Sequence, residues 1–182
     1  PFVYDPTVLK KPPTSYSIMW DPVLKNKVAL WNEISLIFIG ANVLGMDKKR
    51  PATAPGGVFN LSDKQLETIK AKMLTLKGQV RAMWNTGGDA IQLFANKEAA
   101  AAPAWNYIYQ QLKAKKTPIA KATLKSSGAV AWVDGPGIGA GVSTECKDMA
   151  YNWINWVTSP QMQAKLGLST GYSVANPKAR KY

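Results

Sequence analysis

Short apolar segments alternate with helical patterns along most of the chain, and this alternation restricts the fold more than any other feature. Strands that alternate with helices of ten to fifteen residues predict an open α/β sheet with right-handed crossovers. Such sheets bind ligands at the carboxyl ends of their strands. We expect strands at 27–30, 79–84, 99–105 and 129–133, and helices at about 32–44, 63–76, 87–95, 107–115, 147–158 and 160–166.

Residues 1–26 and the helix ends carry local signals of their own. Pro6, Pro12, Pro13 and Pro22 lie in residues 1–26, which favours an extended arm over a helix or a central strand. Ser62, Thr86 and Asn106 are side chains that can cap the helices that follow them, and Gly45 is a suitable stop for the first helix.

The residue types argue against catalysis. The 182 residues include no histidine, which removes the usual serine and cysteine triads, histidine-ligated metal sites and the commonest general base. Cys146, the one cysteine, is expected to be a small buried apolar residue. The glycine-rich run 135–140 matches a dinucleotide-binding pattern, but Pro136 removes a backbone donor and a hinge-like turn fits better. We therefore expect no enzyme, no metal site and no cofactor.

The chain is strongly basic. Its 23 Lys and Arg against 11 Asp and Glu give a net charge of +12, which raises the question of an anionic partner. The basic residues are scattered and no nucleic-acid motif accompanies them, so we expect no nucleic acid. A basic interaction module that binds an anionic partner or an anionic small solute remains the alternative function.

Several aromatic residues stand beside polar ones, and together they suggest a cage for a small amine. Trp132 lies two residues before Asp134, and Trp105 and Tyr172 also have polar neighbours. A ring and a carboxylate can hold an ammonium group without reacting with it. A single Trp in an apolar run more often packs in a core, so the hypothesis depends on the ordered set. Asn32 and Glu33 end the first expected strand, where ligand contacts gather, although Asn32 can also cap the next helix.

Taken in order, these segments resemble the spermidine/putrescine-type solute-binding proteins of bacterial ABC importers. That resemblance implies the periplasmic binding protein-like II fold, an open sheet flanked by helices. The segments that carry it are 15–22, 27–30, 44–45, 80–86, 105–106, 128–134, 150–160 and 171–177.

The resemblance also implies roles for particular residues. Trp105, Trp132 and Tyr172 would form aromatic walls, and Asp134 would be the anionic anchor. Polyamine-binding members carry carboxylates where this chain has Asn32 and Ser35, unless the register is shifted by one and Glu33 takes that role. Because a buried ammonium without a carboxylate costs on the order of several kcal/mol, we expect a solute with one amine, such as an amino acid or a γ-aminobutyrate-like zwitterion.

The family's usual first lobe precedes the point where this chain begins, so we expect a partial receptor. Residues 1–26 would form an arm or interlobe connection, 27–128 an α/β ligand-binding lobe, and 129–182 the returning hinge and the C-terminal helices. The resemblance further implies a monomeric periplasmic protein that captures a small solute between two lobes and delivers it to an inner-membrane permease.

Overall fold

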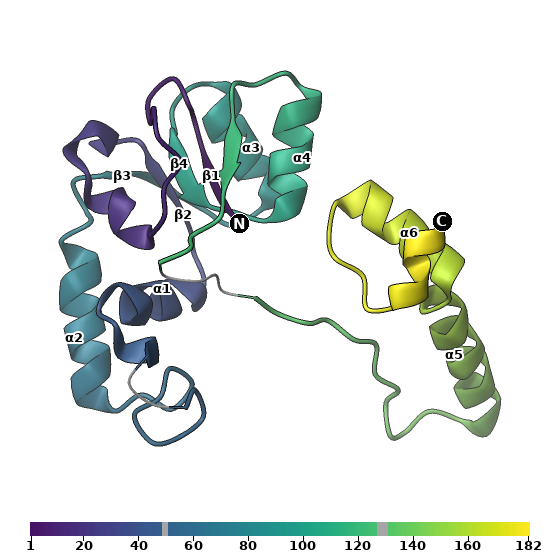
Figure 1. Cartoon of the computed structure of the whole chain (residues 1–182). Coiled ribbons are helices and arrows are strands. Elements are labelled where there is room, and N and C mark those ends of the chain that lie inside the picture. The colour runs from purple at the N-terminus through teal and green to yellow at the C-terminus, as the bar shows by residue number, and fades with distance from the viewer. Residues whose placement is uncertain (49–50, 127–130) are drawn as a thin grey trace. The chain divides into compact units, whose positions relative to one another are not determined.

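The computed structural model describes residues 1–48, 51–126 and 131–182. The chain divides into two compact units, Pro1–Val130 and Ala131–Tyr182, called unit 1 and unit 2 below (Figure 1). The boundary that the sequence suggested, between 128 and 129, lies outside the described residues, and the three-part division stays a prediction.

The described residues of unit 1 form a five-stranded mixed sheet with strand order β3-β2-β4-β1-β5. β2 is parallel to β3 and β4, whereas β1 is antiparallel to β4 and β5. The carboxyl ends of β2, β3 and β4 therefore lie at one edge of the sheet. The strands are β1 (Phe2–Tyr4), β2 (Val28–Trp31), β3 (Val80–Trp84), β4 (Ala101–Pro103) and β5 (Ala120–Ala122).

The first residues do not form the extended arm expected from the sequence. Phe2–Tyr4 is a fully buried strand within the sheet, and two short 3-10 helices follow it, η1 (Tyr16–Trp20) and η2 (Pro22–Leu24). Pro6, Pro12, Pro13 and Pro22 lie outside β1, so none of them removes a ladder hydrogen bond of that strand. The sequence did not predict β1 because a strand of three residues is too short to show an alternating pattern. The strand β5 was missed for the same reason.

Helices cover both faces of the sheet and create two cores. Along β1, Phe2 and Tyr4 lie in one core and Val3 in the other, as the two-residue period of a strand requires. The first core receives η1, η2, α1 and α2, and the second receives α3 and α4. Contacts join α1 to α2 and α3 to α4 (Figure 1). The helices are α1 (Ser35–Val43), α2 (Asp63–Leu74), α3 (Gly87–Ala95) and α4 (Asn106–Ala114), and η3 (Met46–Lys48) is a short 3-10 turn.

Most predicted helix ends agree with the structure. Ser62 and Thr86 both cap their helices, each within a reciprocal capping box whose second members are Gln65 and Asp89. Gly45 adopts φ 67°, as expected of a glycine that ends a helix. The cap at Asn106 is wrong, because Trp105 holds the N-cap position and the Asn106 side chain accepts a hydrogen bond from Lys121 Nζ at 3.1 Å.

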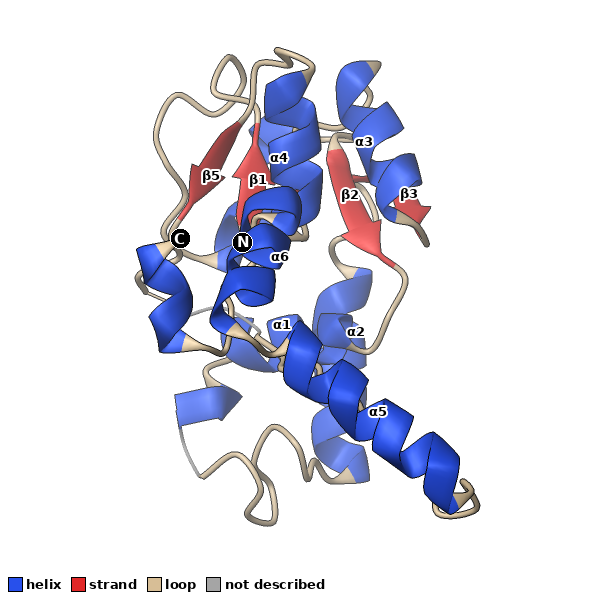
Figure 2. Cartoon of the chain, turned by 90° about the vertical axis from the view of Figure 1, so that its right-hand side faces the viewer, coloured by secondary structure: helices blue, strands red, loops and turns tan. Residues whose placement is uncertain are grey.

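Unit 2 consists of helices and loops (Figure 2). It contains α5 (Thr144–Val157), α6 (Pro160–Thr170) and η4 (Pro177–Lys181), and Ser143 caps α5 three residues earlier than expected. The strand predicted at 129–133 is wrong for 131–133, which form no strand, and residues 129 and 130 lie outside the described residues. Cys146 is exposed on α5 instead of buried.

Within the described ranges of both units, no helix is long and apolar enough to cross a membrane.

The contact between α1 and α2 allows a direct test of the packing. A Cβ at Gly40 would stand 2.6 Å from Ile69 Cγ2 and 3.1 Å from Met73 Cγ. We expect Gly40→Ala to destabilise the protein by about 1–3 kcal/mol, because the displaced contacts outweigh the gain in helix propensity. Gly78→Ala is the control, since nothing lies within 4 Å of a Cβ there. Urea unfolding measures both variants, and equal stabilities would contradict this packing.

Candidate functional site

Three tryptophans meet at the carboxyl edge of the unit 1 sheet. Trp31 ends β2, Trp84 ends β3, and Trp105 follows β4. The rings of Trp31 and Trp84 are stacked with centroids 5.6 Å apart, and Trp105 lies edge-on to them at 4.9 Å and 5.2 Å. Trp84 is fully buried, while Trp31 and Trp105 are half-buried. The expected aromatic wall at Trp105 is therefore one part of a three-ring cluster.

Two indole N–H groups of this cluster have no hydrogen-bond partner among the described residues. The Nε1 atoms of Trp84 and Trp105 are buried and find no hydrogen-bond acceptor within the described part of the chain. A buried donor without an acceptor costs about 1–3 kcal/mol. Such donors can be satisfied by a water molecule or by an acceptor atom of a bound solute.

The polar residues of this edge are tied to one another and to the backbone. Asn32 does not cap α1, because Ile34 holds the N-cap position. Its Nδ2 donates to Asn85 Oδ1 at 3.1 Å, and its backbone N–H donates to Trp84 O at 2.9 Å. Glu33 Oε2 instead accepts the N–H of Ser35, the first residue of α1, at 2.8 Å. Asn32, Glu33 and Ser35 thus lie together at the end of β2, beside the tryptophans.

Asp89 supports the neighbouring loop. Its Oδ2 accepts the N–H groups of Thr86 at 2.9 Å and Asn85 at 3.2 Å. The bond from Thr86, followed by the one from Asn85, lowers the pKa of the Asp89 carboxyl below its usual range. The ionised carboxylate therefore holds the loop that carries Asn85.

Trp132, Asp134 and Tyr172 form a second group, in unit 2. Trp132 Nε1 donates to Asp134 Oδ2 at 3.1 Å, and the Trp132 and Tyr172 rings meet edge to face with centroids 6.2 Å apart. Trp132 is 50% exposed and Tyr172 38%. Two accessible rings beside a carboxylate provide both the π faces and the negative charge that an ammonium group requires.

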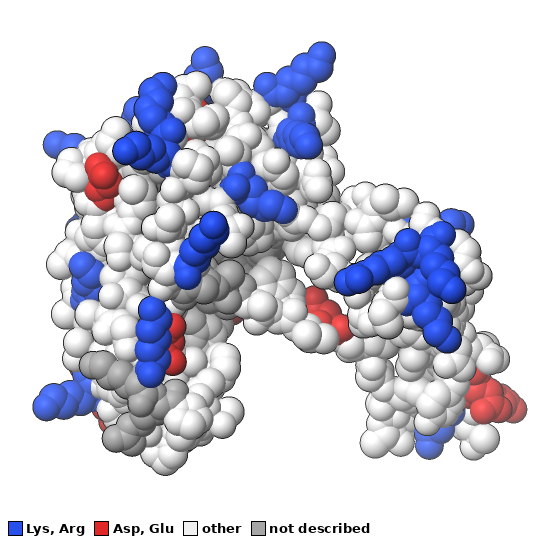
Figure 3. Space-filling view, viewed as in Figure 1, with Lys and Arg blue, Asp and Glu red and all other residues white. Residues whose placement is uncertain are grey.

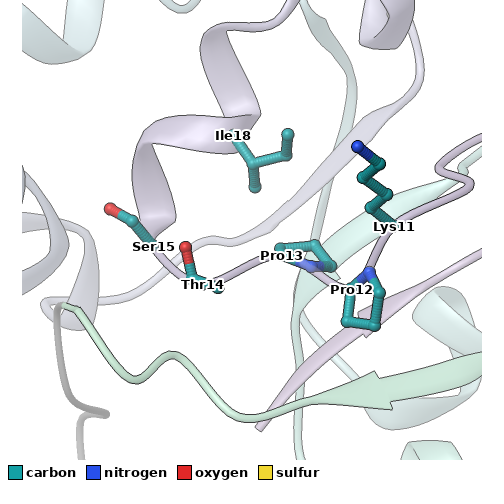
Figure 4. A pocket seen from close by; sticks show the side chains of 6 residues that line it. All are labelled: Lys11, Pro12, Pro13, Thr14, Ser15 and Ile18. Atoms are coloured by element: carbon teal, nitrogen blue, oxygen red, sulfur yellow. The ribbon is translucent and has the colours of Figure 1, made fainter.

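A shallow hollow in unit 1 holds none of the predicted residues. It has a volume of about 230 Å³ and is lined by Lys11, Pro12, Pro13, Thr14, Ser15 and Ile18 (Figure 4). The hollow is smaller than most solute sites and we assign no binding role to it.

Sequence reasoning missed Trp31, Trp84 and Asn85. The available signal was positional: Trp31 and Trp84 are the last residues of two parallel strands, the place where ligand contacts gather in α/β sheets. No group of three His, Cys, Asp or Glu side chains that could hold a metal ion occurs among the described residues.

The family model of bacterial extracellular solute-binding proteins matches residues 1–181. The chain belongs to this family. A relative, the spermidine/putrescine-binding periplasmic protein 1 of Haemophilus influenzae, is 25% identical over 169 residues, which are 92% of this chain and 43% of the relative.

Solved structures share the fold. The spermidine/putrescine substrate-binding protein PotD of Streptococcus pneumoniae, in complex with calcium and HEPES, superposes with a TM-score of 0.73 at 19% identity, over 99% of this chain and 51% of that one. MotA of Agrobacterium tumefaciens B6, in complex with glucopine, superposes with a TM-score of 0.67 at 19% identity, over 99% of this chain and 54% of MotA. A GABA receptor superposes with a TM-score of 0.66 at 20% identity, over 99% of this chain and 52% of the receptor chain. The expected periplasmic binding protein fold is thereby confirmed.

The chain spans about half the length of these relatives. The family is extracellular and the Haemophilus relative is periplasmic, which indicates the periplasmic location that the resemblance implied.

The Asp89 contacts predict a pH dependence. Because its pKa is lower in the folded than in the unfolded protein, its stabilising effect is present above the unfolded value of about 4 and is lost as the pH falls through the folded value. We expect Asp89→Asn to be less stable than the parent near neutral pH and the difference to shrink in acid. Urea unfolding at both pH values tests this, and a pH-independent difference would contradict it.

Proposed function

We propose that this chain is the solute-binding part of a receptor for a bacterial ABC importer, and that it captures an amine-bearing small solute for delivery to a membrane permease. The observation that carries the proposal is the group formed by Trp132, Asp134 and Tyr172 in unit 2. Membership of the solute-binding family supports it, as do the polyamine and GABA proteins among the relatives.

The unit 2 group suits a cation. Asp134 is exposed, so its carboxylate can accept hydrogen bonds from an ammonium group in addition to the bond from Trp132. An ammonium over the face of Trp132 or Tyr172 gains about 0.5–2 kcal/mol, depending on how far it is desolvated. Asp134 is thus the anchor, and the two rings exclude water from the bound amine.

The carboxyl edge of unit 1 carries hydrogen-bond donors. The family resemblance implies that Asn32 and Ser35 stand where polyamine binders carry carboxylates, and the Glu33 carboxylate accepts the Ser35 N–H. The buried N–H groups of Trp84 and Trp105 are hydrogen-bond donors. A second ammonium group would therefore face N–H groups from which it cannot accept a hydrogen bond. A carboxylate or carbonyl oxygen would accept hydrogen bonds from them. We assign Trp105 to the solute wall and favour an amino acid or γ-aminobutyrate-like zwitterion over a polyamine.

The proposed role involves binding without chemistry. Under this proposal the chain binds its solute without catalysing a reaction and uses no cofactor or metal. The whole receptor is a monomer that closes its two lobes around the solute, and the permease recognises that closed state.

A second candidate follows from the charge of unit 2. Lys178, Arg180 and Lys181 lie in the last turn of η4, and Figure 3 shows basic side chains gathered over this part of the unit. Such a surface favours an anionic partner, the basic interaction module considered above. That binding would weaken steeply with salt, unlike capture by rings and one carboxylate.

Substitution of Asp134 tests the proposal. We expect Asp134→Asn to weaken the binding of γ-aminobutyrate or putrescine by about 1–3 kcal/mol, the net value of a hydrogen bond to a charged group. Asp148→Asn, which removes an exposed carboxylate from α5, is the matched control and should bind as the parent does. Isothermal calorimetry on the longest stable form of the receptor measures both, and unchanged affinity in Asp134→Asn would remove Asp134 from the site.

The salt dependence separates the two candidate functions. For amine capture we expect the dissociation constant to change less than about tenfold between low and physiological salt, because one ion pair dominates. A much steeper loss, together with no heat from any amine and binding to anionic vesicles or inorganic phosphate, would favour the basic module.

A further inference from the structure

Four strands of unit 1 begin at the same edge of the sheet. β2, β3 and β4 are parallel, and β5 runs in their direction because β1 is antiparallel to both β4 and β5. Figure 2 shows β2 and β5 starting at the same end of the unit. We call this end the entry edge. It lies at the other end of the strands from the three tryptophans, which end or follow β2, β3 and β4.

The turn before each of these four strands carries exposed lysine. The six residues are Lys25 and Lys27 before β2, Lys77 before β3, Lys97 before β4, and Lys115 and Lys116 before β5. The four turns are thus basic independently of one another, although they are far apart in the sequence.

The backbone holds these turns side by side. The N–H of Lys27 donates to Gln79 O at 2.9 Å, and the N–H of Ala100 donates to Lys27 O at 2.7 Å, so the turns before β2, β3 and β4 are in contact. The starts of β4 and β5 lie on either side of β1, which pairs with both. The six lysines therefore share one end of unit 1, and Figure 3 shows several basic side chains projecting from that end, at the top of the view.

The positive charge of the entry edge is not neutralised locally. The described residues form two salt bridges, Lys70–Glu67 and Arg81–Glu98, and neither includes one of the six lysines. Residues 25–27, 77–79, 97–100 and 115–119, which make up the four turns, contain a single acidic residue, Glu98. Because Glu98 is already held by Arg81 at 2.7 Å, the edge keeps a surplus of positive charge.

The residue types at the entry edge favour a diffuse anionic partner. Protein interfaces are enriched in Arg and aromatic residues and depleted in Lys, and the planar guanidinium of Arg is preferred for holding single carboxylate or phosphate groups. The four turns contain no Arg and no aromatic residue. Flexible, hydrated ammonium groups suit a layer of phospholipid headgroups, where each Lys strengthens binding by about fivefold. The periplasmic location places bilayer surfaces within reach of the chain.

We propose that the entry edge of unit 1 docks electrostatically on the anionic phospholipid headgroups of a membrane. Docking by this edge leaves the tryptophan edge, at the other end of the strands, open to solute. The surface is distinct from the basic residues of η4, and the docking accompanies solute capture instead of replacing it.

Sedimentation with vesicles of equal parts phosphatidylglycerol and phosphatidylcholine tests the proposal on this chain. We expect Lys27→Gln combined with Lys77→Gln to weaken vesicle binding at least about tenfold, because each lysine contributes about fivefold. A second pair, Lys25→Gln with Lys115→Gln, should give the same loss if the turns before β2 and β5 share the surface. Vesicles of phosphatidylcholine alone should not bind the parent.

Lys64→Gln combined with Lys147→Gln is the control, matched in charge. Both lysines are exposed and lie outside the entry edge, in the first turn of α2 and on α5. At physiological salt charges farther than about 8 Å from the bilayer are screened, so this pair should bind within about twofold of the parent.

Four outcomes decide the proposal. Losses at the entry edge with an unchanged control would support it. Failure of the parent to bind anionic vesicles would overturn it, as would equal losses in the entry-edge pairs and the control, which would reflect net charge alone. A loss confined to Lys178→Gln combined with Lys181→Gln would overturn it in favour of η4. Solute binding can fail in the parent without altering any of these results, and that failure would refute the proposed function alone.

Discussion

The parallel pairing of β2 with β3 and β4 is the constraint on which the rest of unit 1 depends. It brings the carboxyl ends of three strands to one edge, and so brings Trp31, Trp84 and Trp105 into ring contact. The same pairing separates the two cores, because alternate residues of each strand point to opposite faces. Backbone pairing forms this edge of the sheet, and the three tryptophans lie there because they end or follow its strands. The same strand pairing therefore determines both the fold of unit 1 and its tryptophan cluster.

The two units contribute different chemistry. The unit 1 edge offers indole and amide donors, while unit 2 offers a carboxylate beside Trp132 and two accessible rings. The side chains of unit 2 remain largely exposed and do not form a buried core.

The long periodic elements could be predicted from the sequence, and the short ones could not. Helices α2 and α3 were placed within two residues because Ser62 and Thr86 cap them, and β3 because its apolar run is distinct. β1 was missed because its three residues show no period and its place in the sheet is set by tertiary pairing alone. For the same reason the sequence suggested Trp105 without its partners: ring contacts arise from strand order, which residue types do not specify. Cys146 is exposed because unit 2 buries almost none of its residues, and no local sequence pattern predicts that low burial.

The most direct test of solute capture uses the seven tryptophans as reporters. Their indole N–H resonances can be assigned by single substitutions and followed by NMR while γ-aminobutyrate or putrescine is added. The account predicts that the Trp132 signal moves along a saturation curve, while those of Trp20 and Trp153 stay in place. Saturable shifts confined to Trp153 and Trp156, or no shift of Trp132 with any amine, would contradict it.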